Sequence, residues 1–589
     1  MAEKRYAKSF CSRIDLLCKI AFLLLFCLAV HSLSAELPAS LARLAASDTV
    51  CNVWVFFKDK PDVGNTPLSK RALERRRDNS YIENVTDTPL NEVYIEQIVR
   101  SGATLRHRFP WGNAASFSVH AGSLELLASM PFVAEIRPVG VYTRRGDDSG
   151  IPKRSWDGSD YGDQYHLEMQ RIKQAHHYIE SKKGEPPGKG VIVAFFDSGF
   201  RLDHRCYDHL RQRDGVIATY DFVENKIDVH DHDSIMNDPG HPYHESDVHG
   251  TQTLSLVAGY EPGRFMGTAW GAQFLLARTE DYYLEVRTEE DNWAAAVVWA
   301  ESLGVDIISS SLGYRDFFDD PDSNYTYEQM DGVSTVVSIA AHEAVRRGVL
   351  IVNSAGNEEG YEPGTIIAPA DVDGVVAVGA VNSNGVRAFW SSIGPTYDGR
   401  IKPDVVAPGV SILVPAAYSE DRYTLNSGTS FSAPIVTGIA ALIMQSTNQK
   451  TSDFVRERLY SSCFFVTGQD SIDNYHGYGM PDALYAVMGR DEIETPYLKV
   501  YPTLVPRGGK LQGEFSVGTA DHPFSSANIS IRSLDGKLVW TRAFHPDPSV
   551  VMDFEWDCTV GGRRVAPGLY FLFATYRGVV FREKFVVGE

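Results

Sequence analysis

From Val53 the chain alternates short apolar strands with helical stretches. Period-two runs rich in Val, Ile and Phe predict strands, and apolar residues at helical spacing predict helices. The expected strands are 53–57, 117–120 and 133–136, and the expected helices are 67–78, which is basic, and 90–101. This pattern is typical of a small α+β unit. It ends in the charged Gly/Asp segment 142–148, which we expect to be exposed.

From about residue 190 the pattern changes to apolar runs without polar alternation, separated by helical stretches. The runs are 191–196, 273–277, 306–309, 350–353 and 375–378, and the helical stretches lie near 251–258, 292–303 and 334–347. Strands that are apolar along their whole length and joined by helices are buried on both faces of a parallel sheet. The sequence therefore predicts a three-layer α/β domain with its active site at the carboxyl ends of the strands.

After Asp491 the helical pattern disappears. Six short alternating runs follow, and Asp535-Gly536 between two of them is a hairpin signal. The runs are 498–501, 514–517, 529–532, 537–540, 569–573 and 583–587. They predict a terminal all-β sandwich.

The first 35 residues have the pattern of an export signal. Five basic residues precede the apolar run 20–30, and the small residues at 32–35 offer a cleavage site. The run is shorter than the roughly 20 residues of a membrane-spanning helix. The alternative is an uncleaved anchor. We therefore expect a secreted or cell-surface protein that is divided into 1–35, 36–146, 147–492 and 493–589.

Charge and cysteine content narrow the function. The 589 residues hold 56 Lys and Arg against 76 Asp and Glu, a net charge of −20, which argues against binding nucleic acid. Residues 36–150 are neutral, with fourteen charges of each sign, so the excess lies further along the chain. Outside the leader stand four cysteines without metal-ligand spacing, too few for a disulfide framework, although one bridge stays open.

Three short motifs at element edges carry candidate chemistry. Asp197-Ser198-Gly199 ends the first apolar strand, His249-Gly250-Thr251 opens a helix, and Gly428-Thr429-Ser430 precedes the apolar helical stretch 435–444. Each motif alone is explained by capping or turns. Together they supply a nucleophile, a base and an orienting carboxylate in a known chain order. A serine at a helix N-terminus also gains from the helix dipole.

A fourth candidate follows the strand 350–353. The amide of Asn357 is placed to donate a hydrogen bond to an oxyanion beside the backbone N–H of Ser430. For Asn357 alone, a turn residue in the left-handed region is the simpler interpretation. The other three motifs favour the catalytic one.

With these motifs the chain resembles the subtilisin-like serine peptidases (subtilases) from about residue 161 to 487. The matching segments, in family order, are Asp197-Ser198-Gly199, His249-Gly250-Thr251, Ser311-Leu312-Gly313, Ala355-Gly356-Asn357, 402–409 and 428–434. The resemblance implies an endopeptidase that cleaves proteins or peptides through an acyl-enzyme. It assigns Ser430 as nucleophile, His249 as general base and acid, Asp197 as its orienting partner and Asn357 as oxyanion donor.

The resemblance also implies a substrate site. Ser311-Leu312-Gly313 would pair with the substrate backbone by β-augmentation, and Ser354-Ala355-Gly356 would form a wall of the first specificity pocket. Counting back from 368–370, the small pocket-base residue of the family falls at Ile367. A branched side chain there would shorten the pocket. We therefore expect small or medium apolar side chains just before the cut.

Two departures from the family limit what can be carried over. Gln252 stands where many relatives have a second histidine, and 259–264 lacks the Asn-rich loop that holds a strong calcium ion. No cofactor is implied for the chemistry, and structural calcium finds no recognisable site. Two clusters could bind metal or could be solvated loops. They are Asp316, Asp319, Asp320 and Asp322, and His230, Asp231, His232 and Asp233.

The flanking regions have resemblances of their own. Residues 36–146 resemble an inhibitory prodomain that templates folding, plugs the cleft with its last strand and is autocleaved near 142–148. Its neutral charge suggests that it is not held electrostatically. Residues 493–589 resemble the C-terminal sorting domains of Bacteroidetes-type secreted proteins, which implies a secretion machinery as partner; the alternative is an immunoglobulin-like addition that binds substrate or cell wall.

Two alternative functions fit parts of the sequence. A non-catalytic binding protein that keeps the fold is disfavoured because the nucleophile, base and oxyanion positions are all intact. Whether the peptidase is a narrow processing enzyme or a scavenging one stays open.

Overall fold

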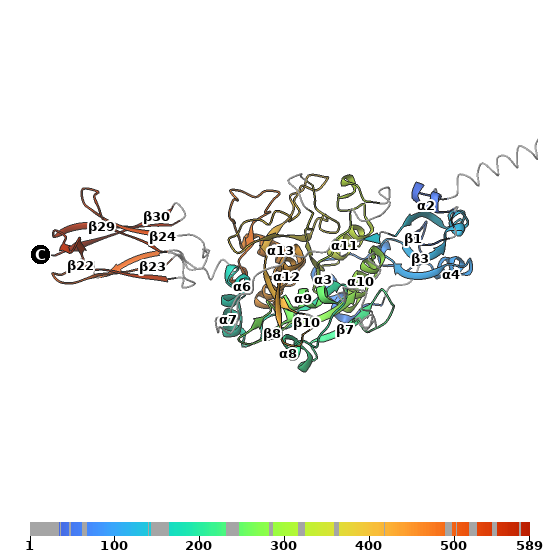
Figure 1. Ribbon diagram of the computed structural model, residues 1–589, viewed down its shortest axis with the longest axis horizontal. Helices are drawn as coiled ribbons and strands as arrows, with labels where there is room; N and C mark the ends of the chain where they lie inside the picture. Colours follow the sequence, from blue (N-terminus) through green and yellow to red (C-terminus); the bar gives the residue numbers. More distant parts are fainter. Residues whose placement is uncertain are drawn as a thin grey trace, which may run out of the picture.

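The structure is a computed structural model that describes most of residues 35–588 (Figure 1). Outside the description lie 1–34, 36, 46, 48, 62–66, 140, 143–163, 231–246, 282–286, 316–323, 359–363, 417–418, 489–496, 502, 517–526, 545–550, 577–578 and 589. These gaps include nearly all of the expected leader, the expected cleavage segment beyond Tyr142 and the acidic run at 316–322.

The N-terminal unit is a four-stranded antiparallel sheet with two helices, α4 and α5, as part of its compact body. The strand order is β2-β3-β1-β4. Its elements are α2 (Ala39–Leu44), β1 (Val50–Phe57), α3 (Lys70–Asp78), η1 (Val85–Asp87), α4 (Glu92–Arg100), β2 (Thr104–Phe109), β3 (Ala114–His120), η2 (Ala121–Ser123), α5 (Leu124–Ala128), β4 (Val133–Pro138) and β5 (Val141–Tyr142). The predicted helices and strands are all present, whereas β2 was not predicted.

Helix α3 lies outside the core of this unit. The hydrophobic core between the sheet and α4 contains no residue of α3. The helix packs instead on α10 of the central domain, and Figure 1 draws it amid that domain's helices. Ala72 of α3 is fully buried. Gly304, which follows α10, lies close against it: a Cβ added to Gly304 would be 2.9 Å from the Ala72 nitrogen.

The central domain is built on a seven-stranded sheet in which every neighbouring pair is parallel. The order is β16-β15-β14-β13-β6-β10-β7. The strands are β6 (Ile192–Asp197), β7 (Val216–Asp221), β10 (Gln273–Arg278), β13 (Ile307–Ser310), β14 (Leu350–Ser354), β15 (Val375–Val381) and β16 (Val405–Pro408). The predicted three-layer parallel-sheet fold is confirmed, but β7 and β16 were missed.

Helices cover both faces of this sheet. One core joins the sheet to α7, α9 and α12, and the other joins it to α10 and α11. The domain's helices are α6 (Tyr165–Met169), α7 (Ile172–Lys183), α8 (Asp208–Gln212), α9 (Val248–Ala258), α10 (Glu290–Leu303), α11 (Val336–Arg346), α12 (Thr429–Thr447), α13 (Ser452–Ser461) and α14 (Ala483–Met488), with η3 (Arg205–Tyr207) and η6 (Tyr327–Gln329). Helix α12 is long and apolar enough to span a membrane, yet 94% of it is buried in the domain.

The central domain also contains short antiparallel strand pairs outside its seven-stranded sheet. They are β8 (Tyr260–Glu261) with β9 (Phe265–Met266), β11 (Glu280–Asp281) with β12 (Arg287–Glu289), β17 (Ile412–Pro415) with β18 (Tyr423–Asn426), and β19 (Cys463–Phe464) with β20 (Met480–Pro481). Strand β5 of the N-terminal unit joins β11 and β12 as a third strand.

The C-terminal region is all-β, as predicted. Two sheets, β21-β23-β26 and β22-β30-β29-β24-β25, enclose a core of their own. The strands are β21 (Tyr497–Tyr501), β22 (Leu504–Val505), β23 (Leu511–Ser516), β24 (Ala527–Ser533), β25 (Leu538–Phe544), β26 (Val551–Trp556), β27 (Thr559–Val560), β28 (Arg563–Arg564), β29 (Gly568–Tyr576) and β30 (Val579–Val587).

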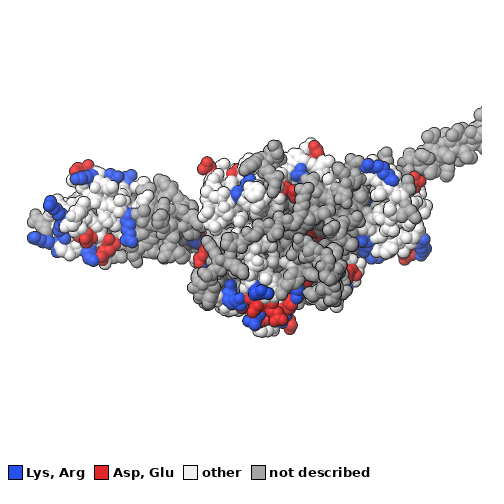
Figure 2. Space-filling model, in the orientation of Figure 1, with Lys and Arg blue, Asp and Glu red and all other residues white. Residues whose placement is uncertain are grey.

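Two sequence expectations on charge and sulfur can be compared with the structure. On the face drawn in Figure 2, basic and acidic side chains are interspersed, and no extended basic area is visible among the described residues. The four cysteines outside the leader are free thiols in the structure: Cys51, Cys206, Cys463 and Cys558. The disulfide that the sequence left open is therefore not formed among them.

Candidate active site

Asp197 is the last residue of β6, at the carboxyl edge of the sheet, and it is almost fully buried. Its Oδ1 accepts a hydrogen bond of 2.8 Å from the backbone N–H of Ser198 and lies 2.7 Å from Nδ1 of His249. Its Oδ2 accepts a hydrogen bond of 3.0 Å from the Thr253 hydroxyl. Both oxygens are therefore held, and the carboxylate fixes the orientation of the His249 ring.

His249 is the second residue of α9, and a glycine allows its helix to approach the strand end. A Cβ on Gly250 would lie 2.1 Å from the Gly199 carbonyl oxygen and 2.9 Å from the Asp197 Cβ. Any larger residue would push α9 away and break the contact between Asp197 and His249. The imidazole also meets the Phe431 ring edge-on, with centroids 6.0 Å apart. This packing brings His249 beside the first turn of α12.

Ser430 is the second residue of α12 and its side chain is nearly buried. Its Oγ lies 3.5 Å from the Ser311 carbonyl oxygen, and the Ser311 hydroxyl donates a hydrogen bond of 2.9 Å to the Ser430 carbonyl. Helix α12 begins at residue 429, earlier than the predicted stretch 435–444. The predicted nucleophile thus lies in the first turn of a 19-residue helix, where the dipole favours negative charge.

Asn357 is fixed by the same turn. Its Oδ1 accepts hydrogen bonds of 2.9 Å from both the backbone N–H and the hydroxyl of Thr429. The Cβ position of Gly428 is 3.6 Å from Nδ2 of Asn357, so the amide group lies over the loop that leads to Ser430. Because Oδ1 is engaged, Nδ2 is the part of this side chain that can serve an oxyanion.

The predicted pocket residues come together. Ser311-Leu312-Gly313 follows β13, Ser354-Ala355-Gly356 begins with the last residue of β14, and the Ile367 side chain lies between the two segments. A Cβ on Gly313 would be 2.0 Å from Cδ1 of Ile367, and one on Gly356 would be 3.0 Å from the same atom. The isoleucine therefore fills the space between the two glycines.

The sequence did not predict β12 or its pairing with the last strand of the N-terminal unit. Val141 and Tyr142 of β5 pair antiparallel with Glu289 and Thr288 of β12. The end of the N-terminal unit is thus added as a strand to the central domain. Nothing in the sequence marked β12, because a three-residue strand that includes Arg and Glu has no apolar pattern.

The remaining sequence candidates have structural partners or lie outside the description. His230 is held by Asp247, with Nδ1 2.8 Å from Oδ2, whereas Asp231, His232 and Asp233 are not described. Gln252 donates to the Pro415 carbonyl and accepts from Asn426. Within the described residues no group of three or more His, Cys, Asp or Glu side chains could hold a metal ion.

Comparisons with known proteins identify the family of the central domain and of the N-terminal unit. The subtilase family (Peptidase_S8) matches residues 188–479, and the peptidase S8 propeptide domain of Bacteroidota matches residues 52–149. Serine protease AprX of Bacillus subtilis (strain 168) is 30% identical over 330 residues, which cover 51% of this chain and 67% of AprX. Subtilisin NAT of Bacillus subtilis subsp. natto is 29% identical over 296 residues, 50% of this chain and 64% of that protein.

Solved structures show the same fold. The epidermin leader peptide processing serine protease of Staphylococcus aureus has a TM-score of 0.51 at 17% identity, covering 74% of this chain and 99% of that one. Fervidolysin from Fervidobacterium pennivorans, a keratinolytic enzyme related to subtilisin, has a TM-score of 0.50 at 18% identity, covering 92% and 72%. With its propeptide domain and its catalytic-domain match, the chain belongs to the subtilase family of serine endopeptidases.

Proposed function

We propose that the protein is an exported serine endopeptidase, made as a zymogen, whose chemistry is carried by Asp197, His249 and Ser430. His249 removes the Ser430 proton as Oγ attacks the peptide carbonyl, and then delivers it to the leaving amine, which leaves an acyl-enzyme. Water attacks the ester with the same histidine as base, and the acid product departs. Asn357 and the Ser430 backbone N–H stabilise the oxyanion in both steps.

One observation carries this proposal. The 2.7 Å contact between Asp197 and His249 joins the end of β6 to the start of α9, and the same histidine packs on Phe431 beside Ser430. These contacts support Asp197 and His249 as a pair at the carboxyl edge of a parallel sheet, where active sites of this architecture lie. The packing on Phe431 supports Ser430, the preceding residue of the same helix turn, as the third member.

Self-processing is tested with the wild type and Ser430→Ala. We expect wild-type protein to be cut near 142–148, as read by intact mass and N-terminal sequencing, and the variant to persist as precursor. The conservative variant Ser432→Ala, two residues along the same helix, is the control and is expected to be cut normally. Identical trimming of the wild type and Ser430→Ala would refute autoprocessing.

Substrate preference follows from Ile367. Its side chain occupies the space between Gly313 and Gly356, so a long or aromatic side chain before the cut would collide with it. We propose substrates with small or medium apolar residues at that position, bound as an added strand along Ser311-Leu312-Gly313. The pairing of β5 with β12 supports the same mode of binding for the end of the propeptide.

Export and the chain ends complete the proposal. Residues 1–35 would be removed as a signal peptide, 36–146 would inhibit and then be released, and 493–589 would serve secretion or surface attachment. The sequence pattern of the leader and the propeptide match support the first two assignments. Protein or peptide substrates, and not nucleic acid, are the expected partners.

A further inference from the structure

Besides the pairing of β5 with β12, the propeptide contacts the central domain through its sheet and through an arm, here residues 67–90. The arm lies between β1 and α4 and contains α3 and η1. It binds the C-terminal ends of α10 and α11. These ends lead into β13 and β14 at the amino edge of the sheet, whereas the candidate active site lies at the carboxyl edge.

The body of the propeptide occupies the other end of α10. Trp54 Nε1 donates a hydrogen bond of 3.2 Å to Glu290, Arg106 Nε donates one of 2.9 Å to Asp291, and His107 lies 2.7 Å from Asn292. Helix α10 has 14 residues, a length of about 21 Å. The sheet of the propeptide therefore binds the first turn of α10, and the arm binds its last turn.

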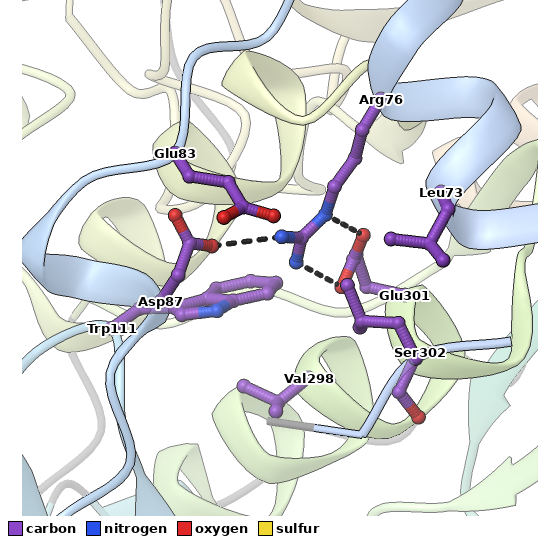
Figure 3. A pocket seen from close by; sticks show the side chains of 9 residues that line it. Leu73, Arg76, Glu83, Asp87, Trp111, Val298, Glu301 and Ser302 are labelled. Atoms are coloured by element: carbon purple, nitrogen blue, oxygen red, sulfur yellow. Dashed lines mark hydrogen bonds and ion pairs between the residues drawn. The ribbon is translucent and has the colours of Figure 1, made fainter. Parts of the chain in front are cut away.

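A buried ion-pair cluster holds the arm (Figure 3). Both carboxylate oxygens of Glu301 in α10 accept hydrogen bonds of 2.8 Å from Nε and Nη2 of Arg76, and Glu301 also pairs with Arg75. The side chains of Glu301 and Arg75 are 1% and 3% exposed, so the charges are withdrawn from water. Bidentate, buried pairs of this kind have high geometric specificity.

In a second ion pair the arm supplies the acid and the central domain supplies the arginine. Asp87 of the arm accepts hydrogen bonds from Arg76, at 2.8 Å, and from Arg347 of the central domain, at 2.9 Å. Arg347 is fully buried and stacks over the Trp111 ring of the propeptide, 4.3 Å from its centroid. Each partner thus supplies an acid to the other's arginine, and the net charge of the propeptide conceals this complementarity.

Within the complex, the Glu301 carboxylate depends on the arm for its ion pairs. Glu301 lies in the last turn of α10, where the helix dipole opposes a negative charge. Among the described residues its ion-pair partners are Arg75 and Arg76, both from the arm. Replacing both arginines would leave this carboxylate buried under the arm without a partner, which is strongly unfavourable.

We propose that the arm is a second docking element of the propeptide, which binds the Glu301–Arg347 site and retains the cleaved propeptide independently of the strand in the cleft. This extends the proposed zymogen function. Cutting the connector after Tyr142 detaches one end of the propeptide, and the arm still holds α10 and α11. Release of the inhibitor is then limited by the rate at which this remote cluster opens.

The test uses the full chain with Ser430→Ala, immobilised through a C-terminal tag. A recognition sequence for a site-specific protease replaces residues 148–154, the folded protein is cut there, and loss of the propeptide is followed by biolayer interferometry. We expect slow release from this parent protein. With Arg75→Ala and Arg76→Ala together, and separately with Glu301→Gln, release is expected to be at least about 100-fold faster.

The matched control is Arg77→Ala. Arg77 is on the same helix, but its side chain is 74% exposed and it pairs with its neighbour Asp78. This variant is expected to release the propeptide at the parent rate. Release from the Arg75/Arg76 and Glu301 variants at the Arg77→Ala rate would overturn the proposal.

A variant could release the propeptide faster because it is misfolded, so a second measurement uses the parent protein without any change in the arm. Hydrogen exchange of the cut parent is expected to leave the amides of α3 as protected as they are before the cut. Rapid exchange of α3, with β1 and β3 still protected, would overturn the proposal without any variant. Because an external protease makes the cut, retention is measured even if the wild type proves inactive, so failure of the proposed peptidase activity is seen separately.

Discussion

Each side chain of the candidate site is held by neighbours that leave a defined part of it for catalysis. Thr253 and Ser198 occupy the Asp197 carboxylate, which in turn orients His249. Thr429 occupies Oδ1 of Asn357 and leaves Nδ2 for an oxyanion. Such prior fixation is what makes hydrogen-bond donors effective in a transition state, because they need no reorganisation during the reaction.

At Ile367 the structure predicts a change of specificity. Ile367→Gly should empty the space between Gly313 and Gly356 and admit large side chains. We expect kcat/KM for substrates with Phe or Leu before the cut to rise about 10- to 100-fold relative to Ala, the range set by adding apolar volume to a pocket. A peptide-library profile of the two proteins checks this. Ile366→Val, at the adjacent buried residue, should leave the profile unchanged, and a profile unaltered by Ile367→Gly would contradict the pocket assignment.

His166 predicts an acid-sensitive step in stability. It is completely buried in α6, neither ring nitrogen makes a hydrogen bond among the described residues, and burial lowers its pKa to about 3. The native state therefore binds fewer protons than the unfolded state between pH 6.5 and about 3, so the contribution of His166 to stability falls as the pH drops through that window. At pH 5 the loss is about 2 kcal/mol.

His166→Phe removes this titration. In the Ser430→Ala background, which avoids self-digestion, urea unfolding is expected to show the variant gaining about 2 kcal/mol on the parent between pH 7.5 and pH 5. His177→Phe, at an exposed position on α7, serves as control and should show no such gain. An equal difference between His166→Phe and its parent at both pH values would rule out the mechanism.

Helix α12 is closely packed along almost its whole length. It contacts α9, α14 and the central strands of the sheet, and nearly all of its residues are buried. A Cβ on Gly438 would lie 1.6 Å from Oγ1 of Thr268, so the glycine is required by the approach of the 268 loop. The helix that carries Ser430 is thereby held at one position along its axis.

Gly438→Ala is therefore expected to destabilise the protein by about 1–3 kcal/mol, the usual cost of overpacking. Urea unfolding in the Ser430→Ala background measures it. The cost should shrink when Thr268→Gly is added, because the colliding atoms are then gone. The same cost in both backgrounds would show that the contact is not its cause.

The sequence predicted the elements whose pattern is set locally. Apolar runs such as 191–196 and 350–353 form central strands. Asp197 contacts His249, and Asn357 contacts the turn that carries Ser430, while the catalytic roles of these residues stay predictions. Strands β7 and β16 were missed because β7 is half-exposed with mixed residues, and β16 is a short Val-Val-Ala-Pro run that ends in proline. The start of α12 was missed because Gly428 to Pro434 does not have the apolar pattern of a helix.

The contacts of α3 were beyond sequence reasoning for another reason. A basic helical stretch usually faces solvent, and the neutral total of residues 36–150 suggested that charge does not hold the propeptide. The structure contradicts that inference, since Arg75 and Arg76 are buried against Glu301. Net charge counts ionic groups without their partners, and these partners are 225 and 226 residues away.

At the scale of the whole molecule, the C-terminal β region has a separate hydrophobic core. Every residue of that core lies between 498 and 587, whereas the propeptide and the central domain share one that includes Trp54 and Trp111. Regions with independent cores fold as separate domains. Propeptide and central domain thus form one packed body, and the β region is an appendage.

A chain that ends at residue 492 is therefore expected to fold, to process itself and to hydrolyse peptides with kcat/KM within about twofold of the full chain. Activity measurements with a peptide substrate and N-terminal sequencing check this. A chain that instead lacks residues 67–90 serves as contrast, because that deletion removes part of the packed body. Loss of activity in the 492-residue chain would contradict the division.

The position of the arm bears on how fast the sheet can form. Arg71 donates to the Gly190 carbonyl and pairs with Asp306, while Arg75 donates to the Arg347 carbonyl. These residues immediately precede β6, β13 and β14, three neighbouring parallel strands. Parallel sheets form slowly because contacts between distant segments carry a large loop-closure entropy. A nine-residue helix that ties the three strand starts together is expected to lower the entropic cost of bringing them together, and so to speed folding as well as to stabilise the final state.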